Sequence, residues 1–320
     1  MKHLFAVLLV VGSLFPLPSP AAFPERAIRI VVPFAPGGGS DFVARVVASK
    51  MPEVLGQNGV VDNRPGAASL IGTQLVANSP NDGYTLLLAD TPFAVNHVIY
   101  RGANYDPIKS FAAVMQLATT PMMLVVTPGL AATSTQEFIA LAKAQPGRVA
   151  MANSGSGSIT HLSGALLMSS AGIELNTVPY KGTGPALSDL MGGQVQSIVA
   201  TAASVMPLVS GGKMRVLGVA SNQRSPFAPT VPTLIEAGVK GYVVNNWYVL
   251  VAAANSPAAV ITTMHKAYAK ILQQPEVRDR FAAAIIEATP NSGPAELQQM
   301  IAAETARWTR VARESNIRLD

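Results

Sequence analysis

Residues 28–41 read IRIVVPFAPGGGSD, an apolar run that ends in a proline, three glycines and two residues that favour helix starts. The β-branched run Ile28–Val32 predicts a buried strand, and Gly37–Gly39 predict a turn before a helix that begins at Ser40 and Asp41. Glycines let the main chain approach a ligand closely, and the first turn of a helix offers unpaired N–H groups with a partial positive charge. The stretch therefore predicts a site for a small anion, either a carboxylate or a phosphate.

The composition describes a packed globular protein with two lobes. The chain has 320 residues, of which 49% are hydrophobic and 13% charged, and this length exceeds what one compact core usually holds. It contains no cysteine, which excludes disulfides and a lipid-anchored cysteine. The formal net charge of +5 comes from scattered residues without a basic stripe, which argues against a nucleic-acid partner and weakly favours anionic solutes.

The N-terminal segment Met1–Ala22 has the features of a secretory signal peptide. A lysine and an apolar stretch over Leu4–Leu17 precede small residues, and cleavage is expected after Ala21 or Ala22. The alternative, a membrane anchor, requires roughly 20 apolar residues, whereas this run is shorter and contains Pro16. We therefore expect a protein that is exported and is freely soluble outside the cytoplasm.

Beyond this leader, strand-like and helix-like segments alternate, which is the pattern of an α/β fold with a largely parallel sheet. Pro52 is expected to end or kink the first helix because proline removes a backbone donor. The expected strands contain or span residues 31–32, 60–61, 85–89, 122–126, 149–152, 177–180, 195–199, 215–220 and 248–253.

The alternation starts again near the middle of the chain, which predicts a second lobe. Ser134 begins a capping box at the start of the helix that opens this lobe. We expect the first lobe to comprise residues 23–125 and 246–320, and the second lobe residues 126–245. The C-terminal segment is expected to form three helices that pack back on the first lobe, starting near Ser256, Pro275 and Pro294.

Four junctions at the ends of strands share the small or polar residues of the first one. The carboxyl-end loops of an open α/β sheet gather at one edge and form the ligand crevice, so we expect these loops to line one site. For any single junction the alternative is that glycine and serine merely form a tight turn before a helix. The junctions are Gly37–Asp41, Asp90–Thr91, Ser154–Ser158 and Ala200–Ser204.

Individual side chains near these junctions have a structural and a binding interpretation. Asp41 is expected to cap the helix, because a free carboxylate beside an anion site would repel the ligand. Lys181 either attracts an anion or is solvated on its loop. His161 either reaches the crevice or bonds a neighbouring loop, and Phe34 and Trp247 either form apolar walls or belong to the core.

Sequence signatures of catalysis and of metal binding are missing. The chain has no GxxxxGK[ST], HExxH or GxSxG motif, and Phe42 stands where the last glycine of GxGxxG would fall. The histidines lack metal-ligand spacing. We therefore expect neither a metal nor a cofactor. A secreted α/β hydrolase-like enzyme stays an alternative through residues that folding alone brings together.

The mature chain carries short motifs in a fixed order: PFAPGGGSD at 33–41, NRPGA at 63–67, DGYTLL at 82–87, PYKGTGPALSDLMGGQV at 179–195 and VPTLIEAG at 231–238. Together they resemble the Bug-type periplasmic receptors of tripartite tricarboxylate transporters. The resemblance implies a type II periplasmic binding protein fold, in which two α/β lobes close over a ligand cleft like a Venus flytrap. It implies a non-enzymatic, monomeric receptor that delivers a small organic carboxylate to membrane permease subunits. A sensory binding protein with another partner is the alternative.

The resemblance also implies the ligand contacts. One ligand carboxylate is expected on the loop Phe34–Asp41 and on a facing loop, largely through backbone groups and ordered water. Many relatives carry Phe-Asp where this chain has Val199 and Ala200, so an acid that could meet a ligand amino group is missing and an amino-acid ligand is less expected. Ala67–Ser69 replace a more glycine-rich turn, which we interpret as a structural variation. With the junction residues, the expected ligand-binding set is Phe34, Ala35, Gly37, Gly38, Gly39, Ser40, Asp41, Thr91, Ser154, Gly155, Ser156, Gly157, Ser158, His161, Tyr180, Lys181, Ala200, Thr201 and Trp247.

Overall fold

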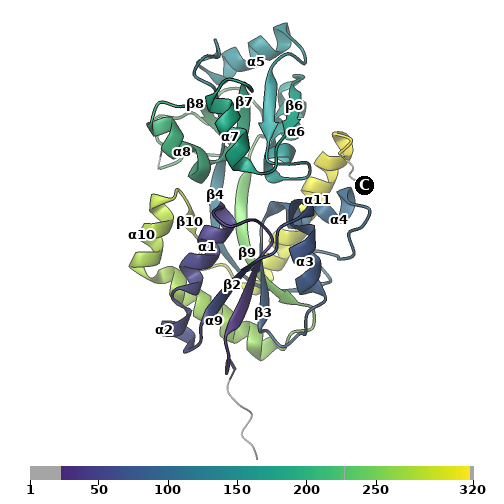
Figure 1. The fold of residues 1–320 in the computed structure, drawn as a ribbon, viewed down its shortest axis with the longest axis vertical. Helices are drawn as coiled ribbons and strands as arrows, with labels where there is room; N and C mark the ends of the chain where they lie inside the picture. Colours follow the sequence, from purple (N-terminus) through teal and green to yellow (C-terminus); the bar gives the residue numbers. More distant parts are fainter. Residues whose placement is uncertain (1–22, 227, 318–320) are drawn as a thin grey trace, which may run out of the picture.

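The computed structural model of the chain describes residues 23–226 and 228–317. The predicted signal peptide lies outside these residues. Two lobes are stacked along the long axis of the molecule and are joined by the strands β4 (Phe111–Val126) and β9 (Asn245–Ala253), as Figure 1 shows. None of the helices in the described part of the chain combines the length and the hydrophobicity that a membrane span needs.

The first lobe is built on a mixed sheet. Besides β9 and the first part of β4, its strands are β1 Ile28–Val32, β2 Gly59–Asn63, β3 Thr85–Ala89 and β10 Glu287–Ala288. β1 pairs in parallel with β2 and β3, whereas β9 runs antiparallel to β3 and β4. The carboxyl ends of β1 and β3 therefore lie side by side at one edge of the sheet, which is where the predicted anion loop and Asp90 follow.

Helices cover both faces of the first-lobe sheet. They are α1 Gly39–Ala48, α2 Met51–Leu55, η1 Ala67–Ser69, α3 Leu70–Ala77, η2 Thr91–Ala94, α4 Asn96–Ile99, α9 Ala258–Gln273, α10 Pro275–Ala283 and α11 Pro294–Glu314. Tyr268 and Phe281 are fully buried with α1 on one face, and Phe93 is fully buried on the other. Pro52 has the predicted effect, because α1 ends before it and α2 starts anew with this proline in its first turn.

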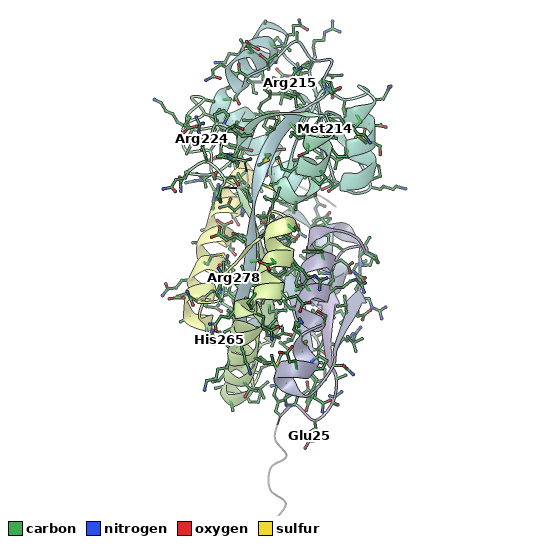
Figure 2. All side chains as sticks on the ribbon, turned by 90° about the vertical axis from the view of Figure 1, so that its left-hand side faces the viewer. Glu25, Met214, Arg215, Arg224, His265 and Arg278 are labelled. Atoms are coloured by element: carbon green, nitrogen blue, oxygen red, sulfur yellow. The ribbon has the colours of Figure 1, made fainter. Side chains whose placement is uncertain are left out.

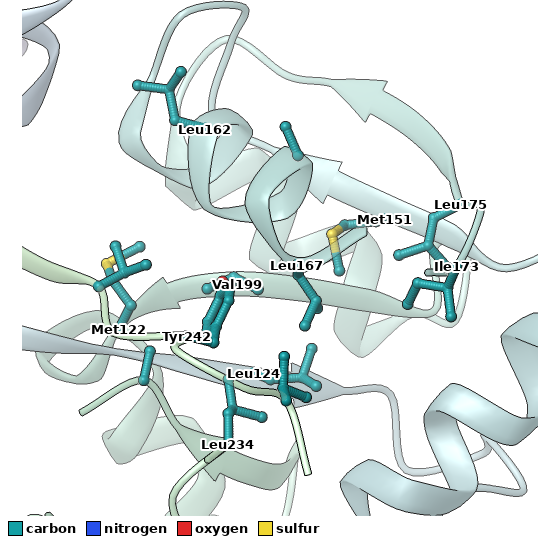
Figure 3. Close-up of a cluster of buried hydrophobic side chains, with 14 of the residues drawn as sticks. Met122, Leu124, Met151, Leu162, Leu167, Ile173, Leu175, Val199, Leu234 and Tyr242 are labelled. Carbon is teal, nitrogen blue, oxygen red and sulfur yellow. The ribbon is translucent and has the colours of Figure 1, made fainter. Parts of the chain in front are cut away.

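The second lobe repeats the arrangement on a smaller sheet. Its further elements are α5 Thr135–Ala144, β5 Ala150–Asn153, α6 Ile159–Ala171, β6 Asn176–Pro179, α7 Thr183–Met191, β7 Ser197–Thr201, α8 Ala202–Ser210 and β8 Arg215–Val219. β5 is parallel to β6 and β7, and the end of β4 is antiparallel to β7 and β8. Leu124, Met151, Leu162, Val199 and Tyr242 belong to the core cluster drawn in Figure 3.

β4 is longer than the sequence predicted and belongs to both lobes. The prediction placed a strand at residues 122–126, but the strand begins at Phe111 and pairs with β9 up to Pro121. From Met122 onward it pairs with β7 and β8. Its residues are buried with few exceptions, so the alternation of apolar and polar residues that marks a half-buried strand is absent. The change of partners lies just before the predicted lobe boundary at residue 125.

α11 corrects the expectation that all three C-terminal helices pack on the first lobe. α9 and α10 do so, and the first half of α11 contributes Leu297 and Ile301 to a first-lobe core. The second half contributes Trp308 and Val311 to a second-lobe core. Figure 1 shows this helix in yellow, running from the lower lobe to the upper one. An amphipathic pattern predicts a buried face, but it does not reveal that the face changes partner along the helix.

Charged side chains are spread over both lobes. Figure 2 shows Arg215 and Arg224 on the second lobe and His265 and Arg278 on the first. Exposed ion pairs such as Arg224–Glu236, at 2.9 Å, are screened by solvent and contribute little to stability. Within residues 23–226 and 228–317, no group of three or more His, Cys, Asp or Glu side chains is arranged to hold a metal ion.

Candidate functional site

The loop between β1 and α1 presents backbone N–H groups that the helix does not use. Gly38 is the N-cap of α1, and its carbonyl accepts the N–H of Phe42 at 2.9 Å. The N–H groups of Gly38, Gly39, Ser40 and Asp41 are therefore the four orphan donors of the helix start. The partial positive charge of the helix start adds to these donors, and Gly38 is exposed. This arrangement suits an anion.

Two glycines of this loop are required by geometry. Gly37 has a φ of +88°, which a residue with a side chain rarely adopts. A Cβ on Gly39 would lie 2.4 Å from the hydroxyl oxygen of Tyr248, so only glycine allows the main chain to lie against this tyrosine. A Cβ on Gly38 would have its nearest neighbour, the carbonyl oxygen of Ala35, at 3.9 Å. The loop thus has two positions that require glycine, Gly37 and Gly39, and one position, Gly38, that is open to a side chain.

Asp41 fixes the loop. Its Oδ2 accepts the N–H of Gly37 at 3.0 Å and Nε of Arg45 at 2.9 Å, and its Oδ1 accepts Nδ2 of Asn63 at 3.0 Å. Burial alone would raise the pKa of the Asp41 carboxyl, but these hydrogen bonds outweigh it and the pKa is lowered. Asp41 therefore stays ionised and engaged. It lies in the first turn and reaches back past the N-cap Gly38, rather than being the N-cap itself.

A buried polar cluster adjoins the loop. Ser40 Oγ donates to Asp90 Oδ2 at 3.3 Å, and Thr91 Oγ1 donates to Asn246 Oδ1 at 3.2 Å. Asn246 also interacts with Asp90 and with Tyr248. Burial raises the pKa of the Asp90 carboxyl to about 7, against the opposing effects of Ser40, its own backbone N–H and Asn246. Asp90 Oδ1 is buried and has no hydrogen-bond partner among the described residues.

The second-lobe loop Ser154–Ser158 has N–H groups that donate to side chains of the helix that follows it. Ser154 N–H donates to Thr160 Oγ1 at 2.7 Å, and Gly157 N–H donates to His161 Nδ1 at 3.1 Å. Ser158 is the N-cap of α6, and its Oγ accepts the N–H of His161 at 3.3 Å. Burial lowers the pKa of His161, which fits a neutral ring that accepts through Nδ1. His161 thus has the structural role that the sequence left open.

Other second-lobe candidates are engaged within their own lobe. The Tyr180 hydroxyl donates to Asp189 Oδ2 at 2.7 Å, and Thr201 Oγ1 lies 2.7 Å from Ser204 Oγ at the start of α8. Ala200 is fully buried in the core. Lys181 is exposed on the loop after β6. The structure does not tie any of these four candidates to the anion loop.

Two contacts bring the second-lobe loops against the first lobe. The Tyr100 hydroxyl, at the end of α4, donates to the carbonyl oxygen of Ser156 at 3.3 Å. Ala203, just after Thr201, packs against the same first-lobe core as Phe34 and Phe42. The loop at 154–158 therefore meets the first lobe at the end of α4, and the start of α8 packs on a first-lobe core.

Trp247 does not lie at the anion loop. Its indole N–H donates to Glu304 Oε2 of α11 at 3.1 Å, and its ring is 4% exposed in the first-lobe core. It lines a cavity of about 190 Å³ with Glu304, Arg307 and residues of β4. Side chains alternate along a strand, so Asn246 and Tyr248, its neighbours in β9, point to the opposite face. Those two residues, and not Trp247, adjoin the anion loop.

Sequence reasoning placed Asp90 in a junction loop but left it out of the ligand-binding set, and it missed Tyr100, Asn246 and Tyr248. Asp90 had a visible signal, because a carboxylate directly after the fully apolar end of β3 is an exception that requires an explanation. Asn246 and Tyr248 flank the predicted Trp247, and the two-residue period of a strand would have assigned them to the other face. Tyr100 had no signal, because its role depends on the approach of the two lobes.

Known proteins resemble this chain over almost its whole length. The model of the family described as "Tripartite tricarboxylate transporter family receptor" matches residues 43–317. Protein BugT of Bordetella pertussis (strain Tohama I) is 35% identical over 325 residues, which cover 100% of this chain and 99% of that protein. The match to the family model begins within α1, whereas the match to BugT also covers the glycine loop.

Two solved structures carry carboxylates in their descriptions. The structure of R. palustris Rpa4515 with adipate matches with a TM-score of 0.86 and 34% sequence identity, and the match covers 92% of this chain and 99% of that one. MatC from Rhodopseudomonas palustris with bound malate has a TM-score of 0.83 and 30% identity, covering 90% and 99%. These likenesses confirm the predicted type II periplasmic binding protein fold and the prediction of a solute receptor rather than an enzyme. The chain belongs to the tripartite tricarboxylate transporter receptor family.

Proposed function

We propose that this receptor binds a small organic carboxylate in the periplasm, holds one carboxylate group on the N–H groups of Gly38, Gly39 and Ser40, and passes the solute to membrane permease subunits. The observation that carries the proposal is the helix start that no side chain caps. Hydrogen bonds to a charged group contribute about 1.5–3 kcal/mol each, and a helix N-terminus adds roughly 0.3–1 kcal/mol for an anion. A carboxylate gains both at this loop.

The relatives and the second lobe support the same class of ligand. Adipate and malate, which Rpa4515 and MatC bind, are both dicarboxylates. β7 contributes no acid beside the lobe interface, because Val199 and Ala200 are buried apolar residues. Family membership supports a permease partner, and the predicted signal peptide supports export. We propose that the receptor acts as a monomer whose lobes close over the solute.

A carboxylate panel tests the proposal. Protein freed of solute by unfolding and refolding is heated with adipate, malate and other organic acids, with neutral sugars as the control. A ligand at 100 times its Kd should stabilise the protein by about 2.7 kcal/mol. Amide NMR then locates the ligand, with the largest shifts expected for Gly38, Gly39 and Ser40 and smaller ones for Gly155 and Gly157. No stabilisation by any acid, or shifts confined to another surface, would refute the proposal.

Capture by membranes tests the final step. The loaded receptor is expected to bind vesicles that contain a tripartite tricarboxylate permease and not vesicles without it. If the loaded receptor is captured by a membrane sensor and not by the permease, its role is signalling rather than transport.

A further inference from the structure

Asp90 is a buried carboxyl group that the proposed carboxylate site does not yet use. It follows β3 directly and is 6% exposed. Its Oδ2 accepts a hydrogen bond from Ser40 Oγ, and Ser40 belongs to the first turn of α1, whose N–H groups form the anion loop. Its Oδ1 is buried without a partner in the described part of the chain. A polar atom with no partner next to a ligand loop requires an explanation.

The groups around Asp90 are neutral. The interactions that set its pKa come from Ser40 of α1, from its own backbone N–H and from Asn246 of β9. Tyr248 of β9 is the titratable side chain that interacts with it, and burial raises the pKa of this phenol above its usual range, so it carries no charge at neutral pH. Asp41 and Arg45, the charged pair on α1, are engaged with each other, 2.9 Å apart.

An ionised Asp90 would oppose an anion on the adjacent helix start, because like charges close together disfavour each other. A protonated carboxyl behaves differently, because it has one O–H donor. Apolar and enclosed surroundings hold carboxylic acids neutral in this way when they must donate a hydrogen bond near pH 7. Since Ser40 already donates to Oδ2, the proton belongs on Oδ1.

We propose that Asp90 is a specificity-determining residue that acts in its protonated form: its Oδ1–H donates a hydrogen bond to the carboxylate held by the N–H groups of α1. This inference rests on the proposed function. Where free Asp90 is ionised, the solvent supplies the proton, and the receptor takes it up together with the ligand. The site therefore selects carboxylates and disfavours ligands with an ammonium group beside that carboxylate.

Calorimetry of the full mature protein with adipate and malate as probes tests the inference. Titrations in phosphate and in Tris at one pH give the number of protons taken up, because the two buffers differ in ionisation enthalpy. Burial places the pKa of free Asp90 at about 7, so uptake approaching one proton is expected at pH 8 and little at pH 6. Affinity should fall by up to tenfold per pH unit above about pH 7, a range in which the carboxyls of both probes are already ionised.

Asp90→Asn is the decisive variant, because an amide donates a hydrogen bond from the same place and does not titrate. It should bind adipate at pH 6 and at pH 8 with equal affinity and no proton uptake. Asp279→Asn, an exposed carboxyl on α10, is the matched control and should keep the proton uptake of the wild type.

Stability provides a second measurement. The pKa of Asp90 is raised from 3.8 to about 7. Its contribution to the free energy of unfolding is therefore most favourable below pH 3.8 and is lost as the pH rises toward 7. Asp90→Asn removes this loss. The Tm of the variant minus the Tm of the wild type should therefore be more positive at pH 8 than at pH 4.5.

The outcomes separate the two proposals. Adipate or malate binding without proton uptake at pH 8 would overturn the role of Asp90 and leave the carboxylate receptor intact. Affinity that rises with pH, together with a preference for amino acids that Asp90→Asn loses, would assign an ionised Asp90 to a ligand cation and would also overturn it. The wild-type titrations decide the question even where a variant fails to fold. Absence of binding by any carboxylate at any pH would overturn both proposals.

Discussion

The two glycine-rich junctions of this protein look alike in sequence and behave in opposite ways in the structure. Gly37–Ser40 and Ser154–Ser158 each join a strand to a helix. The first has Gly38 at the N-cap, with no side chain to accept the first N–H groups. The second has Ser158 there, and Thr160 and His161 engage the rest of the loop. At these two junctions, a side-chain acceptor distinguishes the helix start that is closed from the one whose N–H groups are left open.

The difference also has an energetic side. A serine at an N-cap stabilises a helix by about 0.5–2 kcal/mol relative to alanine. Glycine at the N-cap of α1 loses only roughly a few tenths of a kcal/mol relative to serine, and the hydrogen bonds of Asp41 to Gly37, Arg45 and Asn63 hold the loop. The first junction is thus fixed from one side and open on the other, whereas the second is closed by its own side chains.

Closing the first junction should give the largest effect. In Gly39→Val the new side chain collides with the Tyr248 hydroxyl and shifts the loop, because even the Cβ would lie 2.4 Å away. We expect affinity for the best carboxylate of the panel to fall at least 100-fold, or about 2.7 kcal/mol. In Gly38→Ala, the matched control, the nearest atom is 3.9 Å from the Cβ, and affinity should change only a few-fold. If calorimetry found wild-type affinity in Gly39→Val, the first junction would not be the solute site, and the contrast between the two junctions would be wrong.

Opening the second junction should cost stability rather than affinity. Thr160→Val removes the oxygen that accepts Ser154 N–H and contacts the hydroxyls of Ser154 and Ser158. An unsatisfied buried donor costs about 1–3 kcal/mol, so the free energy of unfolding should fall by this amount in denaturant titrations. Thr263→Val is the control, because the hydroxyl of this half-buried threonine on α9 makes a solvent-exposed hydrogen bond, and it should change the free energy of unfolding by less than about 0.5 kcal/mol. Equal losses in both variants would contradict the internal role of Thr160.

Acid should loosen the second junction before the first. Burial lowers the pKa of His161 below its ordinary value of 6.5, and its Nδ1 must be unprotonated to accept Gly157 N–H. Its contribution is therefore complete above pH 6.5 and is lost as the pH falls through the lowered pKa. His161→Asn keeps an acceptor near Nδ1 and does not titrate, so its free energy of unfolding should fall less steeply between pH 7 and pH 5. A slope identical to that of the wild type would show that the ring does not carry the effect.

The smallest effect is expected at Trp247. Trp247→Phe removes the N–H that donates to Glu304 while Trp308 continues to donate to the same oxygen. We expect a loss of about 1 kcal/mol in stability and no change in carboxylate affinity, since the ring faces α11. A drop in affinity larger than the drop in stability would return Trp247 to the ligand site.

The strand and turn at the first junction were predictable because their causes are local. β-branched residues over Ile28–Val32 and the glycines at 37–39 each have a strong conformational preference that no other part of the chain opposes. The same reasoning located the second junction but not its chemistry, because Thr160 and His161 act by hydrogen bonds that residue types alone do not specify.

Contacts between distant segments escaped prediction. Asp90 meets Ser40 and Asn246 only after three parts of the chain converge at the end of β3. Trp247 was included in the expected ligand-binding set, whereas the alternation of β9 turns it toward α11. The full length of β4 was hidden because both of its faces are buried and its apolar run lacks a period.

α11 connects the two lobes, since Leu297 is buried in a first-lobe core and Trp308 in a second-lobe core. Any rotation of the lobes must displace the far end of this helix relative to the first sheet. A pair of fluorophores, one at the exposed Glu25 and one at the exposed Arg313, would turn that displacement into a change in energy transfer. The chain is therefore suited to conversion into an optical sensor for its own solute.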